Sequence, residues 1–410
     1  MGFCRALWDD LSVRTSSGTK RKSTEAPTDS GKKMKLTPKS PREETDYPVK
    51  LHDFVRERFF VLRKAGCGSF AAVWICWDVE RRQFVALKIS KHTKEVLEAT
   101  WTEVEIYKHL QKKVPLRRNI VALHEWFQLR HDGHTHVCLV FELMGMNLQQ
   151  RIRTNKTGFT AFDVQRILTD VLGGLRILHE NNIVHTDLKP ENILTGISVQ
   201  DELELTDRTI VAMKKMQGTD RFLGALRKHE RRLSRGGEKR EVVIKVADLG
   251  SAQFLKEHLI YDYMVTTQPY RSFEVLMRDE WTTSTDIWSV GCVAYELATA
   301  KMLLPVVDED ERLHLNWMIS RLGMPRSELR HSGRHARVHF DARGGRVDDS
   351  HINSYKVKPE KIMVHNRVGF SAKKAELLCD FIWRTLDFDK MKRPSSAACL
   401  QHPFIANPFR

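Results

Sequence analysis

The hydrophobic pattern of this chain changes its period near residue 147, and this change restricts the folds that the chain can adopt. Before that point, apolar and polar residues alternate, which predicts strands at 59–62, 72–77, 84–89, 120–128 and 136–141. After it, apolar residues recur at helical spacing, which predicts helices at 162–181, 285–300, 311–322, 371–386 and 395–401. One helix, at 95–112, is expected within the first half. We therefore expect an α+β fold with a small β-rich lobe, 49–144, and a larger helical lobe, 145–406.

Two segments depart from this pattern. Residues 1–48 are rich in Ser, Thr, Lys and Pro, which predicts a disordered basic tail. A basic insert at about 195–241 lies between two strand-like segments and is expected to be partly helical. Its stretch 214–240 has ten Lys or Arg against three acidic residues. The net charge of +15 indicates phosphorylated or polyanionic partners, although charge does not determine the fold.

Composition excludes several classes of protein. No apolar run approaches the roughly 18 residues of a membrane-spanning helix, so no membrane association is expected. The first residues are too poor in apolar side chains for a secretory signal. The seven cysteines are scattered and form no Cys-x-x-Cys pair, which favours reduced thiols over disulfides or a zinc site. His131, His134 and His136 fall on a predicted hairpin, where a solvated turn is favoured over a metal site.

A glycine-rich turn precedes a strand lysine and a helical glutamate. Gly66-Cys67-Gly68 lies between two predicted strands, and glycines let a backbone approach a phosphate closely. Lys88 follows on a strand and Glu103 on the predicted helix, so that the two can pair and direct the ammonium at phosphates. Alone, each of these features is more often a plain turn or a surface residue.

Further motifs follow in a fixed order. The segment 185–192 reads His-Thr-Asp-Leu-Lys-Pro-Glu-Asn, and Asp-Leu-Gly occupies 248–250 after an apolar strand. Glu274, Asp286 in Asp-Ile-Trp-Ser, and Arg393 before a proline complete the series. Taken in this order, the motifs resemble the signature of eukaryotic protein kinases. The resemblance implies a bilobal protein kinase domain over residues 49–406, with ATP and Mg²⁺ as cofactors.

The resemblance also implies roles for individual residues. Asp187 would accept or orient the proton of a substrate hydroxyl, and Lys189 would steady the transferring γ-phosphate. Asn192 and Asp248 would bind Mg²⁺, which prefers hard oxygen ligands. The residues expected to bind ATP are Gly66, Cys67, Gly68, Val73, Lys88, Glu103, Glu142 and Met144.

Supporting roles follow from the same resemblance. Phe141 would line the back of the ATP pocket, beside a hinge at 142–144 whose backbone meets adenine. Glu274 would pair with Arg393, Asp286 would hold the backbone of the catalytic loop, and Thr267 would bridge Asp187 and Lys189.

Two positions depart from the usual kinase motifs. Thr186 replaces the arginine that commonly binds a phosphate on the activation segment, and Leu249 replaces phenylalanine in the Asp-Phe-Gly motif. Together these departures predict activity that depends less on phosphorylation of the activation segment.

Within the CMGC group, the motifs are most similar to those of the SR-protein kinases, notably at 73–78 and 270–276. The LAMMER kinases, which are dual-specificity enzymes, are the alternative, because 314–323 partly matches their motif. The resemblance implies transfer to Ser in basic, Arg/Ser-rich nuclear or RNA-processing proteins. Acidic residues at 308–311 could receive such substrates, but the Arg- and His-rich segment 326–346 would repel them.

Basic clusters in the tail bear on localisation. Lys20-Arg21-Lys22 and Lys32-Lys33-Met34-Lys35 are spaced like a bipartite nuclear import signal, which predicts import receptors as partners and a nuclear and cytoplasmic location. A different class of function stays open, namely a basic scaffold or nucleic-acid-binding protein that uses 1–48 or 195–241.

Overall fold

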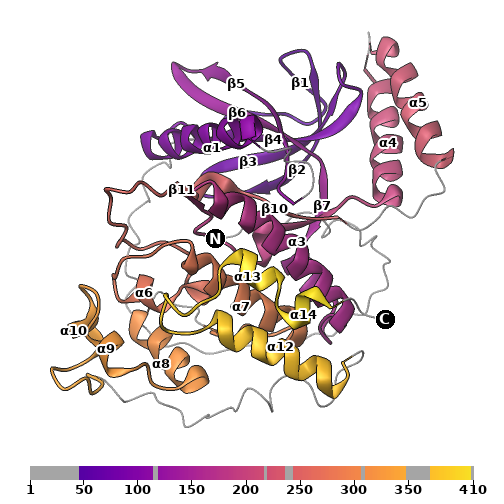
Figure 1. The fold of residues 1–410 in the computed structure, drawn as a ribbon. Coiled ribbons are helices and arrows are strands. Elements are labelled where there is room, and N and C mark those ends of the chain that lie inside the picture. The colour runs from indigo at the N-terminus through magenta and orange to yellow at the C-terminus, as the bar shows by residue number, and fades with distance from the viewer. Residues whose placement is uncertain are drawn as a thin grey trace, which may run out of the picture.

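The computed structural model describes residues 46–113, 119–216, 219–235, 243–305, 310–347 and 370–407. Its N-terminal lobe is an antiparallel sheet with strand order β1-β2-β3-β4-β6-β5 (Figure 1). The strands are β1 (Phe54–Val55), β2 (Phe59–Cys67), β3 (Ala71–Asp78), β4 (Gln83–Ser90), β5 (Leu123–His131) and β6 (His134–Glu142). One long helix, α1 (Lys94–Lys113), packs on this sheet through an apolar stripe that includes Val104, Tyr107 and Leu110.

The C-terminal lobe is mainly helical. Its helices are α2 (Leu148–Thr154), α3 (Ala161–Glu180), α6 (Phe273–Leu276), α7 (Ser284–Thr299), α8 (Glu311–Leu322), α9 (Ser327–Arg330), α10 (Ala336–His339), α12 (Ala372–Thr385), α13 (Ser396–Leu400) and α14 (Pro403–Ala406). Helix α7 is buried on all sides at the centre of this lobe. Gly291 allows α12 to approach α7 closely, because a Cβ at this position would lie 2.5 Å from Thr385 Oγ1.

Short strands and 3₁₀ turns connect the lobes and position the loops between them. They are β7 (Met144–Asn147), β8 (Ile183–Val184), η1 (Pro190–Asn192), β9 (Ile193–Gly196), β10 (Ile244–Val246), η2 (Leu249–Ser251), β11 (Gln253–Phe254) and η3 (Gln268–Tyr270). The five strands among them form two small antiparallel sheets, β10-β9-β7 and β11-β8. As a result, the loops that follow β8 and β10 face each other beneath the large sheet.

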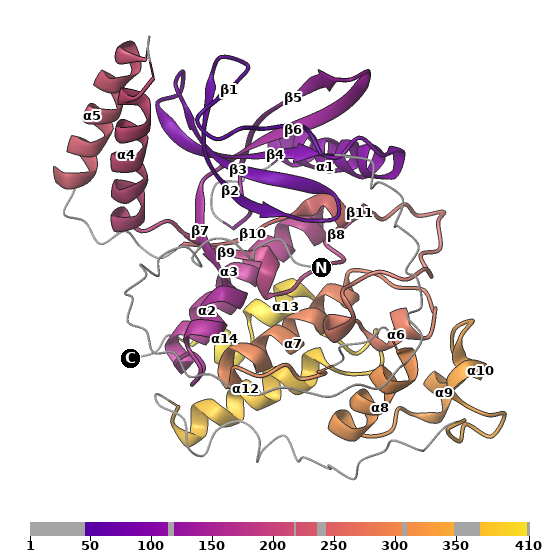
Figure 2. The same cartoon turned by 180° about the vertical axis from the view of Figure 1, so that it is seen from behind.

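The basic insert forms a helical hairpin, α4 (Val199–Lys214) and α5 (Asp220–Arg235). Although it begins in the C-terminal lobe after β9, the hairpin stands beside the N-terminal sheet in both views (Figures 1 and 2). Its apolar residues share one core cluster with Phe60, Ile75, Trp77 and Phe84 of the sheet.

The structure confirms the expected α+β architecture and the main helices and strands. The prediction missed β1, β7, β8 and β11, because strands of two to four residues are too short to produce a readable alternation. None of the helices in the described ranges is long and apolar enough to span a bilayer. The tail at 1–45 and both of its basic clusters lie outside the described residues.

Candidate active site

A cleft opens between the two lobes and has an apolar part and a polar part. The apolar part encloses about 840 Å³, including its open mouth. It is lined by Ala65, Gly66, Val73, Ile75, Ala86, Lys88, Glu103, Tyr107, Val121, Phe141, Glu142, Leu143, Met144, Gly145, Glu191, Asn192, Leu194, Ala247 and Asp248. The adjoining polar part adds Gly68, Ser69, Phe70, Asp187, Lys189 and Gly250, among others. The sequence does not predict the positions of Tyr107, Val121 and Leu194 in the cleft, because nothing in it distinguishes them from other apolar core residues.

Lys88 lies at the junction of the two parts. Its Nζ is 2.7 Å from Glu103 Oε2 and 2.9 Å from Asp248 Oδ1, so strand β4, helix α1 and the loop after β10 meet at one ammonium group. Burial lowers the pKa of Lys88, but the carboxylates of Asp248 and Glu103 outweigh burial and raise that pKa above its ordinary value. The lysine is therefore a fixed positive charge inside the cleft.

The glycine-rich turn covers the cleft from the β2–β3 side. Gly66 pairs with Val73 across the two strands, and Gly68 donates a backbone hydrogen bond to Ala71 O at 2.9 Å. Cys67 is exposed, and its Sγ lies 3.7 Å from Asp46 Oδ2. Among the residues that the structure describes, Cys67 does not line the cleft, so its expected contact with a nucleotide is restricted to its backbone.

The hinge at 142–144 lies along the edge of the apolar part. The Glu142 carboxylate is turned away from a ligand, since its Oε1 accepts from Lys245 Nζ at 2.6 Å and from Ala122 N at 2.7 Å. Glu142 and Met144 both line the cleft. The carboxylate of Glu142 is hydrogen-bonded to Lys245 and Ala122. The expected role of this segment accordingly falls on its backbone.

Four donors hold the Asp187 carboxylate in place. Thr267 donates to Oδ1 through Oγ1 at 2.6 Å and through its backbone N at 3.1 Å. On Oδ2, Lys189 Nζ lies at 2.7 Å and Asn192 Nδ2 at 3.3 Å. Lys189 also donates to Thr267 Oγ1 at 2.7 Å, so Thr267 bridges both residues as predicted. The carboxylate keeps one orientation at the mouth of the cleft.

Asp286 holds the backbone of this loop in a strained conformation. Its carboxylate accepts from His185 N at 2.8 Å, from Thr186 N at 2.9 Å and from His179 Nε2 at 2.9 Å. Thr186 has a φ of 63°, in the left-handed region that a β-branched residue rarely adopts. Such a conformation persists only where the surroundings enforce it. The buried helix α7, which carries Asp286, therefore determines the shape of the loop around Asp187.

Two side chains with oxygen atoms suited to a hard cation, Asn192 and Asp248, line the polar part. Asn192 donates through Nδ2 to Asp187 O at 2.9 Å, which leaves its amide oxygen available to a cation. Asp248 also has a left-handed φ of 62°. Burial raises the pKa of Asp248, but the Lys88 ammonium outweighs this and holds it below its ordinary value. The described residues contain no group of three or more His, Cys, Asp or Glu that could hold a metal. This pair suits Mg²⁺, which retains waters and substrate phosphates as further ligands.

Comparison with known proteins agrees with this geometry. The family model of the protein kinase domain matches residues 59–226 and 233–405 of this chain. This chain belongs to the protein kinase family. Serine/threonine-protein kinase AFC3 of Arabidopsis thaliana is 30% identical to this chain over 369 residues. The matched residues cover 88% of this chain and 84% of AFC3.

Two human proteins are also similar to the kinase. Dual specificity protein kinase CLK2 is 29% identical over 357 residues, 86% of this chain and 65% of that protein. Dual specificity tyrosine-phosphorylation-regulated kinase 3 is 30% identical over 370 residues, 86% of this chain and 55% of that protein. With these relatives, the kinase is a serine/threonine protein kinase of the CMGC group.

Two acids near the cleft of the kinase, the half-buried Glu191 and the buried Glu296, were not predicted as a site from the sequence. Glu296 of α7 is 2% exposed and accepts from the Tyr270 hydroxyl at 2.7 Å. Burial, together with the nearby Glu191, raises the pKa of Glu296 to about 7. Glu191 lines the cleft, and its Oε2 is buried without a hydrogen-bond partner among the described residues. No local signal reveals this pair, because its members are 105 residues apart.

The acidic segment expected to receive basic substrates has other roles. Asp308 and Glu309 lie outside the described residues. Asp310 caps α8 by accepting from Arg312 N and Leu313 N, and Glu311 pairs with Arg278 at 3.0 Å. The two described acids are therefore engaged within the C-terminal lobe, and they are not a free acidic surface.

Proposed function

We propose that this kinase transfers the γ-phosphate of ATP to serine or threonine hydroxyls in arginine-containing, basic protein segments. The observation that carries the proposal is the fixed Asp187 carboxylate, held by Thr267, Lys189 and Asn192 within one cleft with Lys88 and Asp248. Phosphoryl transfer requires positioning and neutralisation of charge more than covalent catalysis, and these residue types supply both.

The residues divide the work in a way that follows from their positions. The apolar part of the cleft accommodates adenine, while Lys88 neutralises phosphate charge at its inner end. Asp187 accepts the proton of the substrate hydroxyl as the new O–P bond forms and the bond to the ADP leaving group breaks. Lys189 neutralises charge on the transferring group. Asn192 and Asp248 would hold Mg²⁺, which shields the phosphates when it is bound.

The half-buried Glu191 and the buried Glu296 support a preference for arginine in the substrate. A buried carboxylate oxygen without a partner is costly, and a guanidinium group can satisfy it through charge-assisted hydrogen bonds. Burial, and to a smaller extent the nearby Glu191, raise the pKa of Glu296, and a guanidinium group bound here would favour the charged form of this carboxyl group. We infer that an arginine close to the acceptor serine enters this site.

Replacing Glu191 or Glu296 with glutamine is expected to raise the KM for an Arg/Ser peptide by about 10- to 100-fold, as for loss of one charged hydrogen bond. Measurement of radiolabel transfer to the peptide, and to a matched peptide with the arginine replaced by alanine, checks this. The KM for ATP should not change. Equal KM values of wild type and both variants for the arginine peptide would contradict the assignment.

Because of the same site, we expect the kcat/KM for arginine peptides, and not for other peptides, to depend on pH. Because the pKa of Glu296 is about 7, its charged form increases as the pH rises from 6 to 8. Binding of the guanidinium requires that form, so kcat/KM for the arginine peptide should rise by up to about tenfold over this range. The rise should be absent in Glu296→Gln and for the alanine peptide.

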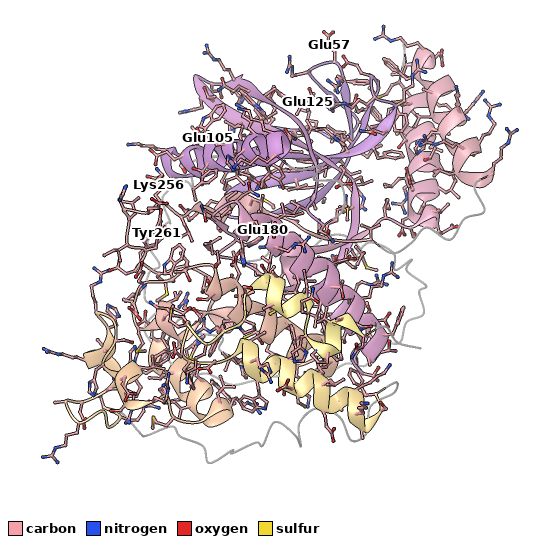
Figure 3. The ribbon with its side chains drawn as sticks, viewed as in Figure 1. Glu57, Glu105, Glu125, Glu180, Lys256 and Tyr261 are labelled. Atoms are coloured by element: carbon pink, nitrogen blue, oxygen red, sulfur yellow. The ribbon has the colours of Figure 1, made fainter. Side chains whose placement is uncertain are left out.

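We further propose that activity needs little phosphorylation of the activation segment. Thr186 Oγ1 donates directly to Ser251 O at 2.7 Å, and Arg271 donates to the carbonyls of Val265 and Thr266. The buried Tyr261, labelled with Lys256 in Figure 3, donates to Phe254 O at 2.8 Å. These contacts lie within the protein and connect the segment to the residues around it.

Phosphatase-treated kinase is therefore expected to retain at least about half of its peptide activity, because the ordering contacts are uncharged or internal. Mass spectrometry of the treated protein must show an unmodified segment 251–271. Thr186→Ala in the same treated form should lower kcat several-fold, since the bond to Ser251 is lost. Inactivity of the unmodified wild type would contradict the proposal.

Finer assignments remain proposals. The CLK relatives favour the LAMMER alternative over the SR-protein kinases, and a dual specificity for tyrosine is part of that alternative. We also propose nuclear entry through import receptors that bind residues 20–35, with nuclear or RNA-processing proteins as substrates.

A further inference from the structure

The α4–α5 hairpin uses its apolar face to attach to the N-terminal sheet. One core cluster joins Trp77 and Phe84 of the sheet with the apolar residues of the hairpin, Leu205, Ile210, Ala212, Met213, Leu223 and Leu226. At the centre of this contact, the His229 ring lies 5.3 Å from Trp77, and its Nε2 is 2.9 Å from Glu202 Oε1. The inner face of α5 is therefore buried against α4 and the N-terminal sheet.

The outer face of α5 has the opposite character. Its exposed cations are Arg221, Arg227, Lys228, Arg231, Arg232 and Arg235. They extend over 15 residues, from Arg221 to Arg235, or roughly 21 Å of helix. None of the six forms an ion pair within the described part of the chain. Side chains with nitrogen tips project outward from this hairpin, away from the body of the molecule (Figure 3).

We propose that this cationic face of α5 binds the sugar–phosphate backbone of double-stranded RNA. The other exposed residues of the helix are Asp220, Gly224 and Ser234, so the face offers no apolar or aromatic anchor. Interfaces with folded proteins depend on such anchors, whereas interfaces with nucleic acid are polar and strongly positive. A membrane surface is disfavoured, because an interfacial helix inserts its apolar face, and here that face is buried against the sheet.

The structure favours a duplex over a single strand. Single strands are held by stacking of bases on aromatic side chains, and the one aromatic residue of α5, Phe222, is half-buried with its ring 5.8 Å from Phe54. It favours RNA over DNA because both grooves of B-form DNA are deep, whereas α5, packed along α4 and the sheet, presents its cations only on its outer face. The wide, shallow minor groove of A-form RNA presents phosphates and 2′-hydroxyls to such a surface.

The test measures binding of a fluorescent 20-base-pair RNA duplex to the full chain by anisotropy, between 50 and 200 mM salt and without ATP. The variant Arg227→Gln/Lys228→Gln/Arg231→Gln/Arg235→Gln keeps good helix formers and removes four charges. Its salt slope, log K against log salt, should be smaller than that of wild type by about three to four, and binding at 100 mM salt at least about tenfold weaker.

The matched control removes four exposed cations elsewhere, as Lys112→Gln/Lys113→Gln/Arg343→Gln/Lys373→Gln, and should bind RNA like wild type. Both variants should phosphorylate a peptide at the wild-type rate, which shows that they are folded. Equal RNA binding by the α5 variant and the control would overturn the proposal, as would equal or tighter binding of a B-form DNA duplex. Because binding is measured without ATP, failure here is distinguishable from failure of the proposed kinase activity.

Discussion

Replacing Asp187 with asparagine is expected to lower kcat for peptide phosphorylation by about 10³-fold, within the range for loss of a general base. The substitution preserves the shape of the side chain but removes its charge. Thr267 and Lys189 would then donate to a neutral amide, and the side chain at 187 could no longer accept the proton of the substrate hydroxyl. Radiolabel transfer from Mg²⁺/ATP to an Arg/Ser peptide measures the effect.

Two controls make this result specific. Asp132→Asn changes the same group on the exposed β5–β6 hairpin and should leave the rate unchanged. Binding of ATP, followed as thermal stabilisation, should remain in Asp187→Asn, because Lys88 and the apolar cleft are intact. A variant that binds ATP and retains a tenth of the wild-type rate would contradict the role of Asp187 as the base.

Replacing Arg393 with alanine is expected to lower the free energy of unfolding by about 3–5 kcal/mol, because it leaves a buried carboxylate unpaired. The Arg393 guanidinium donates to both oxygens of Glu274 at 2.7 and 2.6 Å, and also to Asp387 O at 2.7 Å. It also lies 5.0 Å from the centre of the Trp288 ring. Urea unfolding of the purified protein measures the loss.

An exposed pair of the same chemistry provides the control. Arg384 pairs with Asp380 at 2.9 Å on the surface of α12, and Arg384→Ala should cost within about 1 kcal/mol. A loss for Arg393→Ala no larger than that for Arg384→Ala would show that the buried pair does not brace the lobe. Arg393→Lys should recover only part of the lost free energy of unfolding, since a lysine cannot donate to both carboxylate oxygens in parallel.

The Glu274–Arg393 pair also makes stability depend on pH. Burial raises the pKa of Glu274, but Arg393 outweighs burial and holds that pKa below its ordinary value of 4.5. The stabilisation is therefore complete above about pH 5 and is lost as the pH falls through the pKa of the folded state.

The sequence motifs predicted most of the chemical groups in the site and their local setting. Lys88, Glu103, Asp187, Asn192 and Asp248 lie in one cleft because each follows a recognisable strand, helix or loop motif. The contribution of Cys67 was less well predicted. A glycine-rich turn fixes the path of the backbone, but not the direction of the side chain between its glycines.

By itself, the sequence determined the order of the longer strands and helices and the residue types that phosphoryl transfer requires. Both are properties of local pattern: the period of apolar residues and short motifs. Only the tertiary structure decided which distant groups come together: Thr186 donates to Ser251, and Glu191 lies near enough to Glu296 to influence its pKa. It also decided that the basic insert docks on the N-terminal sheet and turns its cations outward. These contacts depend on burial between segments far apart in the chain, and no local pattern encodes them.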